Sequence, residues 1–392
     1  MKKYITAILA AALVSCSGAG TNNPDNWQNY YPSEDNPPYQ GDDAEDYPDR
    51  TAPVGCSDLV LLYGGSQHRT PFEWPSTTIR DYVTWQDPQG SQHWLFDGFL
   101  LLEFMLTQHN VTLITGYQWQ GSYLVSASKA HWQSLADYYF KSGSGVDAIE
   151  NSCREAASVI GNPPSKRKIV IGIPEPIQYY DSHNKSGGTK YWGELEGTEL
   201  DFSLPSHRIA AVKWYIDRVR ANFKAKNYQY VELAGFYWVA EKATQSRDIL
   251  KGVSEYLHGM NYSFNWIPYY TADGYASWKS FGFDFAYLQP NYFFNESVPF
   301  SRLADACNDA ISAGMGMEVE FDGNASVANG RGYRLRDYMS EFKRFGIWDS
   351  CPLAYYQGSW ALKWLKDSSK PEDVALYNDF CNWVVTRPFR EK

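Results

Sequence analysis

The sequence predicts an α/β fold of the (β/α)8 TIM-barrel type, and three observations predict it. Eight short apolar runs, rich in β-branched and aromatic residues, recur along the chain with longer amphipathic segments between most of them. Residues 54–392 have the length of one such barrel, and no second low-complexity linker divides them. An open nucleotide-binding sheet would require a GxGxxG or GxxxxGK motif after the first run, and neither motif is present there. We therefore expect a single closed barrel.

Two N-terminal segments precede the predicted barrel, and residues 1–15 form the first, an export signal. Lys2 and Lys3 are followed by an apolar stretch that is too short to span a bilayer. The run Leu-Val-Ser-Cys that ends at Cys16 resembles a bacterial lipobox, which implies cleavage before Cys16 and lipid attachment to its sulfur. We expect a lipoprotein of the cell envelope, anchored to a membrane through Cys16. An ordinary secretory peptide is the alternative, and the sequence leaves open the periplasmic face or the outer surface.

The second segment, residues 16–53, is predicted to be a flexible, disordered tether. Apart from a cluster of acidic residues it consists mainly of Asn, Pro, Tyr and Gly, and it has almost no aliphatic side chain to bury. The whole chain carries a formal net charge of −10, and its only basic run, residues 166–168, comes just before a predicted strand. We expect that run to be a solvated loop, and we expect no nucleic-acid partner.

Neither the cysteines nor the histidines indicate a metal site or a cofactor. Five cysteines follow Cys16, an odd number without the close spacings of a zinc or redox site, so at least one should be unpaired. The seven histidines are scattered, and the chain contains neither a GxSxG nor an HExxH motif. We therefore expect a protein without a metal ion or an organic cofactor.

The predicted strands are the apolar runs, taken in chain order. They cover residues 58–65, 96–103, 168–176, 230–241, 263–270, 283–294, 315–322 and 351–358. The predicted helices with the clearest boundaries cover residues 144–161, 205–226, 245–260, 302–314 and 334–346. Pro205 and Ser206 are typical of a helix start, and Gly346 is typical of a helix end.

Acidic residues at the ends of the predicted strands are the candidate catalytic groups, because a TIM barrel carries its active site at the C-terminal ends of its strands. Glu241 ends the fourth predicted strand, and Glu318 and Glu320 lie two residues apart on one face of the seventh. Carboxylates in such apolar runs are costly unless they are used or paired. We predict Glu241 and Glu320 to be the catalytic pair. The alternatives are a salt bridge to a neighbouring strand for Glu318 and Glu320, and a solvated loop position for Glu241. Three further acidic residues lie near strand ends, Glu103, Glu175 and Asp322.

The positions of the pair resemble those of a known group of enzymes. An acid/base carboxylate on strand four and a nucleophile on strand seven are typical of the clan of retaining TIM-barrel glycoside hydrolases, and Glu241 and Glu320 match it by position. Ala240 departs from the clan, which has Asn immediately before the acid/base residue. The segments LLYGG, FDGFLLLE, GFYWVAE and GMEVEFD also make the body similar to an uncharacterised family of Bacteroidetes lipoproteins with a glycosidase-like barrel. The resemblance implies cleavage of a glycosidic bond by two carboxylates, with a retaining mechanism.

Aromatic and polar residues near the strand ends are predicted to contact a carbohydrate. Aromatic residues make up 17% of the chain, which suits a protein that stacks sugar rings on its side chains. The predicted substrate-binding residues are Tyr237, Trp238, Tyr270, Asn291, Tyr292, Tyr356, Gln357 and, in the long loop 65–74, His68. We further expect Tyr292 to hydrogen-bond Glu320 and hold it ionised. A second long loop, residues 179–200, is expected to be a flap that faces the substrate.

Two main functions follow from these residues. The first is a glycoside hydrolase whose partner is an oligosaccharide or polysaccharide substrate brought to a bacterial envelope. The second is a carbohydrate-binding barrel without turnover that serves glycan uptake, which Ala240 keeps open. A purely structural lipoprotein is a third hypothesis, and it would leave the strand-seven carboxylates without a use. The gap between the two carboxyl groups, about 5–5.5 Å for retention and wider for inversion, decides the stereochemical outcome.

Overall fold

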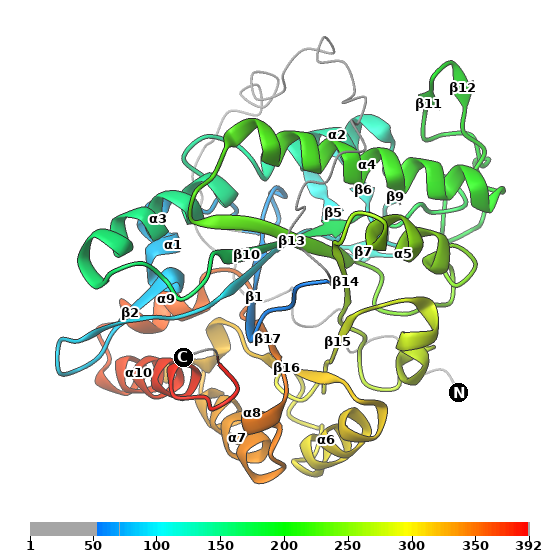
Figure 1. Ribbon diagram of the computed structural model, residues 1–392. Helices are drawn as coiled ribbons and strands as arrows, with labels where there is room; N and C mark the ends of the chain where they lie inside the picture. The colour runs from blue at the N-terminus through cyan, green and yellow to red at the C-terminus, as the bar shows by residue number, and fades with distance from the viewer. Residues whose placement is uncertain (1–52, 70, 391–392) are drawn as a thin grey trace.

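The structure is a computed structural model that describes residues 53–69 and 71–390. Within these residues eight parallel strands form a closed barrel, and helices surround it (Figure 1). The barrel strands are β1 (Asp58–Tyr63), β4 (Gly98–Leu102), β10 (Arg167–Ile173), β13 (Val231–Trp238), β14 (Ser263–Trp266), β15 (Phe285–Leu288), β16 (Gly316–Glu320) and β17 (Leu353–Tyr356). The prediction of a (β/α)8 TIM barrel is confirmed. The predicted signal peptide, the tether up to Ala52 and Cys16 lie outside the described residues.

The barrel strands follow one another in chain order around the ring. Each pairs in parallel with its neighbours, and β1 closes the ring on β17 with Asp58 opposite Leu353. Seven of the apolar runs predicted from the sequence contain one of these strands, and β10 begins one residue before its run, at Arg167. The runs are apolar because both faces of the strands are covered, as in β1, where every residue is buried.

The two faces of a barrel strand pack against different parts of the molecule. On β1, Leu59 and Leu61 belong to a small cluster inside the barrel. Val60 and Leu62 belong to the large cluster between the strands and the helices. This alternation follows from the two-residue period of a strand. It also determines which residues at the end of a strand can reach the barrel axis.

Helices form the outer layer (Figure 1). The α-helices of the described residues are α1 (Ser76–Val83), α2 (Lys129–Tyr138), α3 (Gly145–Ile160), α4 (Pro205–Lys226), α5 (Leu250–His258), α6 (Ser301–Ala313), α7 (Gly332–Arg344), α8 (Ile347–Ser350), α9 (Ala361–Lys366) and α10 (Pro371–Val385). Three short 3-10 helices are η3 (Thr107–His109), η4 (Tyr275–Phe281) and η5 (Gly323–Ala325). The five predicted helices correspond to α3, α4, α5, α6 and α7. Between β14 and β15 the connection contains η4 in place of an α-helix.

Short strands lie in the long connections of the first half of the barrel. They are β2 (Thr84–Gln86), β3 (Gln92–Trp94), β5 (Met105–Leu106), β6 (Val111–Thr112), β7 (Gln118–Trp119), β8 (Ser122–Tyr123), β9 (Val125–Ser126), β11 (Glu194–Leu195) and β12 (Thr198–Glu199). All except β2 and β3 follow β4 or β10 directly, so they lie beyond the C-terminal ends of the barrel strands. Loops at this end carry the active site of a TIM barrel.

The basic run at the opposite end of the barrel is mostly buried. Arg167 and Lys168 are 2% and 5% exposed, so the expectation of a solvated loop is correct only for Lys166. The guanidinium of Arg167 lies 4.8 Å from the ring centre of Trp94. A charged group that lies over an aromatic ring loses less free energy on burial than an isolated charge does. The apolar part of the arginine side chain is itself favourable to bury.

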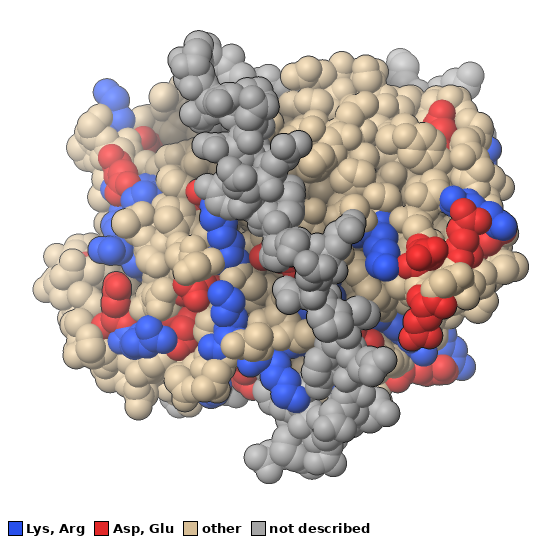
Figure 2. Space-filling model, turned by 90° about the horizontal axis from the view of Figure 1, so that it is seen from above, with Lys and Arg blue, Asp and Glu red and all other residues tan. Residues whose placement is uncertain are grey.

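Three further features of the described residues bear on the class of protein. Positive and negative side chains are interspersed on the face that Figure 2 shows. No helix in the described part of the chain is long and apolar enough to cross a membrane. The five cysteines of that part form no disulfide bond with one another, which agrees with the expectation of at least one unpaired thiol.

Candidate active site

Glu241 and Glu320 lie at the C-terminal ends of two barrel strands. Glu320 is the last residue of β16, the seventh barrel strand, and Glu241 follows β13, the fourth. Tyr237 on β13 and Val239 just after it face the barrel interior, and Glu241 continues that alternation. Glu320 is 2% exposed and Glu241 is half-buried. Both carboxyl groups therefore lie at the mouth of the barrel.

One short segment after β15 contacts both carboxyl groups. The side-chain amide of Gln289 donates to Glu241 Oε1 at 3.0 Å and to the carbonyl of Ile267 at 2.9 Å. The backbone N–H of Asn291 donates to Glu320 Oε2 at 2.7 Å. Gln289 and Asn291 are two residues apart, so their Cα atoms are separated by no more than about 7 Å. The two carboxyl groups therefore lie near each other at the barrel mouth.

Glu320 accepts a second hydrogen bond that comes from helix α7. The hydroxyl of Tyr338 donates to Glu320 Oε2 at 2.6 Å. Asn291 has a φ of 53°, a left-handed conformation that Asn tolerates better than most residues. Two donors thus converge on one oxygen of Glu320, an arrangement that stabilises the ionised form of a carboxyl group.

A third carboxyl group, Glu318, lies deeper on the same face of β16. It is 2% exposed, and its Oε1 has no hydrogen-bond partner among the described residues. No Lys, Arg or His in the described part of the chain forms an ion pair with Glu241, Glu318 or Glu320. The alternative of salt bridges from neighbouring strands is therefore wrong for Glu318 and Glu320.

Burial shifts the acidity of all three groups. It raises the pKa of Glu241 to about 7, against the hydrogen bond from Gln289 and the charge of Lys242, which lower it. It also raises the pKa of Glu320 to about 7, although the donors Tyr338 and Asn291 lower it. For Glu318, burial and the neighbouring carboxyl groups raise the pKa well above its ordinary value. Two of the three groups can therefore exchange protons near neutral pH.

Two of the predicted substrate contacts lie at this mouth. Tyr237 faces the barrel interior, and its pKa is raised by burial and by the charges of Glu241 and Glu318. Tyr356 ends β17, is half-buried, and its ring packs edge-on against Phe294 at a centroid distance of 5.4 Å. Both tyrosines therefore lie near the carboxyl groups.

Three predicted substrate contacts point elsewhere. Trp238 is fully buried between the strands and the helices, where its ring packs edge-on against Phe264. Gln357 is 1% exposed, and its amide oxygen accepts from the hydroxyl of Tyr82 at 2.9 Å. Each lies one residue from an inward-facing position, so the alternation of the strand turns it outward. Their assignment as substrate contacts is wrong.

The third of these residues is Tyr292, whose hydroxyl donates to Asp337 at 2.6 Å. The side chain of Tyr292 therefore does not bond Glu320, and the hydroxyl of Tyr338 takes that role, while the backbone N–H of Tyr292 lowers the pKa of Glu320. Glu320 was also expected to be held ionised by a hydrogen bond. Instead, burial outweighs the hydrogen-bond donors and raises the pKa of Glu320.

The remaining predicted contacts lie on the rim. Asn291 contributes its backbone N–H to Glu320. Tyr270 is half-buried under Arg302, whose guanidinium lies 4.4 Å from its ring centre. His68 Nδ1 lies 2.8 Å from the hydroxyl of Ser66, and burial lowers the pKa of this imidazole to about 2. A histidine with that pKa is neutral at physiological pH and serves as a polar contact.

Two further residues at the mouth were not predicted from the sequence. Arg69 Nε donates to Glu103 Oε2 at 3.0 Å. Burial raises the pKa of Tyr117, Arg69 lowers it, and Tyr356 and Glu241 raise it further. These groups therefore face one another across the mouth. Arg69 follows His68, a predicted contact, in the same loop. Tyr117 lies in the long connection after β4, where no sequence pattern marks it.

The other acidic candidates have structural partners. Glu103 accepts from Arg69, as described above, and Glu175 accepts from the backbone N–H of Thr115 at 2.7 Å and from the hydroxyl of Ser246 at 2.9 Å. Asp322 accepts from the backbone N–H of Asn324 at the start of η5. The described residues contain no group of three His, Cys, Asp or Glu side chains that could hold a metal ion.

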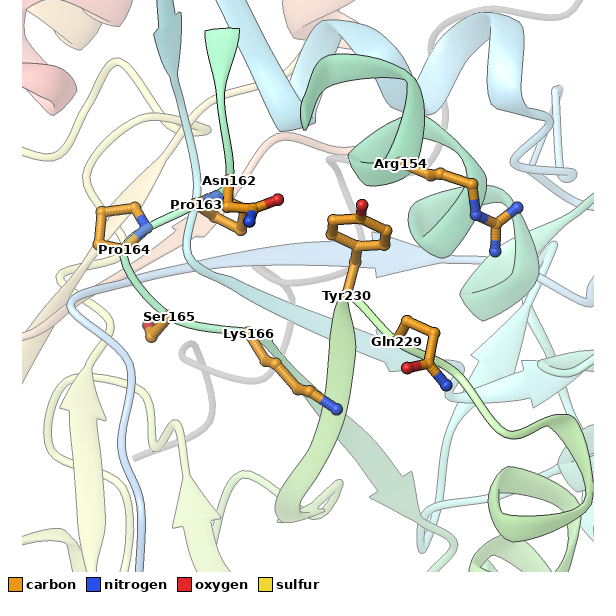
Figure 3. A pocket seen from close by; sticks show the side chains of 8 residues that line it. All are labelled: Arg154, Asn162, Pro163, Pro164, Ser165, Lys166, Gln229 and Tyr230. Atoms are coloured by element: carbon orange, nitrogen blue, oxygen red, sulfur yellow. The ribbon is translucent and has the colours of Figure 1, made fainter. Parts of the chain in front are cut away.

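A surface hollow of about 600 Å³ lies at the other end of the barrel (Figure 3). Its lining residues are Arg154, Asn162, Pro163, Pro164, Ser165, Lys166, Gln229 and Tyr230. Residues 162–166 precede β10, and Gln229 and Tyr230 precede β13. The hollow therefore lies at the N-terminal ends of the strands, where conserved features of TIM barrels serve stability and not catalysis.

The comparisons with known proteins describe the family and the fold. The family model of a domain of unknown function, DUF4855, matches residues 58–382. No curated protein matches the chain. A candidate alpha-L-fucosidase from Bacteroides thetaiotaomicron VPI-5482 is 13% identical, with 85% of this chain and 97% of that chain covered and a TM-score of 0.42. A mutant tryptophan synthase alpha-subunit from the hyperthermophile Pyrococcus furiosus is 10% identical, with 84% and 97% covered and a TM-score of 0.35.

Proposed function

The chain belongs to the DUF4855 family of domains of unknown function, and from its site we propose that it is a glycoside hydrolase of the bacterial envelope. The observation that carries the proposal is the group of buried carboxyls at the barrel mouth that have no cationic partner among the described residues. Glycosidic bond cleavage needs two carboxyl groups on either side of the bond, one of them protonated near neutral pH. Glu241 and Glu320 meet that need.

The surroundings of the two groups suggest different roles. Glu320 receives two hydrogen bonds on one oxygen, which favours its ionised form and suits a group that stabilises or traps the sugar carbon. Glu241 receives one hydrogen bond, from an amide, and burial raises its pKa to about 7, as it raises that of Glu320, so the number of donors and not the pKa separates the two groups. Glu241 is therefore suited to protonate the leaving oxygen and then to activate water. These roles correspond to a retaining mechanism.

The substrate is proposed to be an oligosaccharide or polysaccharide that reaches the protein at a membrane surface. This part of the proposal depends on the lipobox that ends at Cys16, which lies outside the described residues. A Cys16→Ala variant should remain unprocessed or become soluble, because lipid attachment requires that thiol. Detergent partitioning of the variant like that of the wild type would contradict the lipid anchor.

A carbohydrate-binding barrel without turnover is the second candidate function. Ala240 favours it, since the retaining clan has Asn at this place. Aromatic side chains around the mouth, such as Tyr237 and Tyr356, would serve binding as well as cleavage. The two candidates differ in one property, which is the release of an aglycone.

Aryl glycosides test the proposed activity directly. A panel of 4-nitrophenyl glycosides should contain at least one that releases 4-nitrophenol. On that substrate Glu241→Gln should retain part of its activity, because a good leaving group departs without a proton. Added azide should then restore turnover by attacking the glycosyl enzyme, as a retaining mechanism requires.

The control for this experiment is Glu255→Gln, which changes an exposed glutamate in the second half of α5. It should retain full activity. Hydrolysis of no glycoside, together with binding of glycans to the purified protein, would contradict the hydrolase and favour the binding barrel. Full activity of both Glu241→Gln and Glu320→Gln would show that other residues carry the chemistry.

A further inference from the structure

Glu318 occupies a position that the proposed pair does not explain. It lies two residues before Glu320 on the same face of β16, so it sits about 6.6 Å closer to the centre of the barrel. It is 2% exposed, and its Oε1 has no partner among the described residues. A buried polar atom without a hydrogen bond destabilises the folded protein. No hydrogen bond to Glu318 Oε1 among the described residues offsets this destabilisation.

The groups that face Glu318 come from three strands and one helix. β13 supplies Tyr237 and the acid Glu241, β16 supplies Glu320, β17 supplies Tyr356 and α7 supplies Tyr338. None of these groups is a cation. Burial and the two neighbouring acids raise the pKa of Glu318 well above its ordinary value, which favours the protonated form. A protonated carboxyl has one hydrogen to donate and an oxygen to accept with.

We propose that Glu318 forms the floor of the sugar site, where its carboxyl hydrogen-bonds a hydroxyl of the sugar ring held between Glu241 and Glu320. This inference rests on the proposed function and adds the class of substrate to it. The bound ring supplies the partner that Glu318 Oε1 lacks in the protein alone. Glu318 contacts the substrate and takes no part in proton transfer to the leaving group.

The charge of the site restricts the sugar that can bind there. Three carboxyl groups face one another here, and none of the groups that face Glu318 is a cation. Arg69 at the mouth is already paired with Glu103, so an anionic sugar at this position would lie beside these acids without a free cation. A hydroxyl, by contrast, can both accept from and donate to a protonated carboxyl. The site is therefore built for a neutral pyranoside, and it excludes uronic acids and sulfated sugars from this position.

Two variants of Glu318 separate a binding role from a packing role. Glu318→Met keeps the approximate volume and removes the polar atoms, and Glu318→Gln keeps a donor and an acceptor. Glu318→Met should raise the Tm of the unliganded protein, since it removes an unpartnered polar group. It should also weaken the binding of neutral 4-nitrophenyl glycosides by about 10-fold to 100-fold. Glu318→Gln should bind them within about threefold of the wild type.

Monodeoxy analogues of the best-bound glycoside identify the hydroxyl. One analogue should bind the wild type and Glu318→Met with equal affinity, because both partners of the hydrogen bond are then absent. Binding is measured by calorimetry and turnover by release of 4-nitrophenol. A rise in Tm with a loss of affinity is a combination that a residue needed only for packing does not produce.

The outcomes distinguish this inference from the proposed activity. Binding that depends on Glu318, in a protein that hydrolyses no glycoside, would refute the hydrolase and support the inference. A lower Tm with unchanged affinity in Glu318→Met, or equal weakening for every deoxy analogue, would overturn the inference while leaving the hydrolase intact. Tighter binding of a glucuronide than of every neutral glycoside would overturn the substrate class.

Discussion

At the N-terminal end of the barrel, the carboxylate of Asp58 is fully buried and lies between two arginines. Arg387 contacts its Oδ1, and Arg390 Nε lies 3.5 Å from its Oδ2. At the C-terminal end, Glu318 and Glu320 are 2% exposed. Neither of them has a cationic partner among the described residues.

The difference shows what each end of the barrel contributes. A buried carboxylate with a cation and several hydrogen bonds holds neighbouring segments together, and here Asp58 joins the start of β1 to the chain beyond α10. Burial raises the pKa of Asp58 too, but its two arginines lower it, whereas no cation offsets burial for Glu318 and Glu320. The N-terminal end therefore contributes stability, and the proposed chemistry lies at the C-terminal end. Substitutions at the two ends should have opposite effects.

The largest effect is expected for Glu320→Gln. Turnover of any glycoside substrate should fall by about 10³-fold or more, because the substitution removes the negative charge that acts on the sugar carbon. The free energy of unfolding should remain unchanged or increase, since a buried acid is replaced by a neutral amide of the same shape. Steady-state kinetics and urea unfolding measure the two quantities. Loss of activity together with a large loss of stability would contradict the contrast between the ends.

Arg387→Met should have the converse effect. Its guanidinium is fully buried, and its removal leaves buried Asp58 with only the longer contact to Arg390, which should lower the free energy of unfolding by about 3 kcal/mol. The kcat of the molecules that remain folded should stay unchanged. Arg336→Met is the matched control, because Arg336 and Asp379 form an exposed pair, which is worth at most about 1 kcal/mol. Equal destabilisation by both variants would refute a special role for the buried pair.

The fold could be predicted from the sequence because burial of both strand faces leaves a clear pattern. In β1 every residue is buried, and the run around it is apolar throughout. Glu318 and Glu320 were recognisable for the complementary reason, since a carboxyl group in such a run has no solvent to reach. The position of Glu241 followed from the rule that catalytic residues lie at strand ends.

The errors at the site concern the direction of single side chains. Trp238 could have been excluded from the sequence, because the two-residue period that turns Tyr237 inward turns its neighbour outward. The same rule separates Gln357 from Tyr356. Tyr338 gave no such signal, because it lies on the buried face of a helix that the sequence does not place against any strand. Contacts between distant elements of this kind become visible only in the folded chain.

The unpaired carboxyls should also make stability depend on pH. Glu241 has a pKa of about 7 in the folded protein against an ordinary value of 4.5. Its unfolded form therefore loses a proton between about pH 4.5 and 7 while the folded form retains it, so stability falls as the pH rises through that window. The free energy of unfolding of the wild type, minus that of Glu241→Gln, should decrease by about 3 kcal/mol between pH 4.5 and 7.5. A difference that does not vary with pH would show that Glu241 ionises normally.

The smallest effect, and the most specific one, is expected for Tyr338→Phe. The hydroxyl of Tyr338 donates to Glu320 and lowers the pKa of that carboxyl, while Asn291 supplies the second donor. Removing the hydroxyl should therefore raise the pKa of Glu320 above about 7. The acidic limb of the profile of kcat/KM against pH, which reports the ionised form of this residue in the free enzyme, should move to higher pH by about one unit.

The control for this shift is Tyr292→Phe, whose hydroxyl donates to Asp337 and not to Glu320. It removes the same atom from a neighbouring ring, and it should leave the acidic limb in place. At a pH two units above the limb, Tyr338→Phe should approach the activity of the wild type, because Glu320 is ionised in both proteins there. A limb that moves equally in both variants would assign the shift to altered packing. A uniform loss of activity at every pH in Tyr338→Phe would mean that the hydroxyl orients Glu320 without setting its charge.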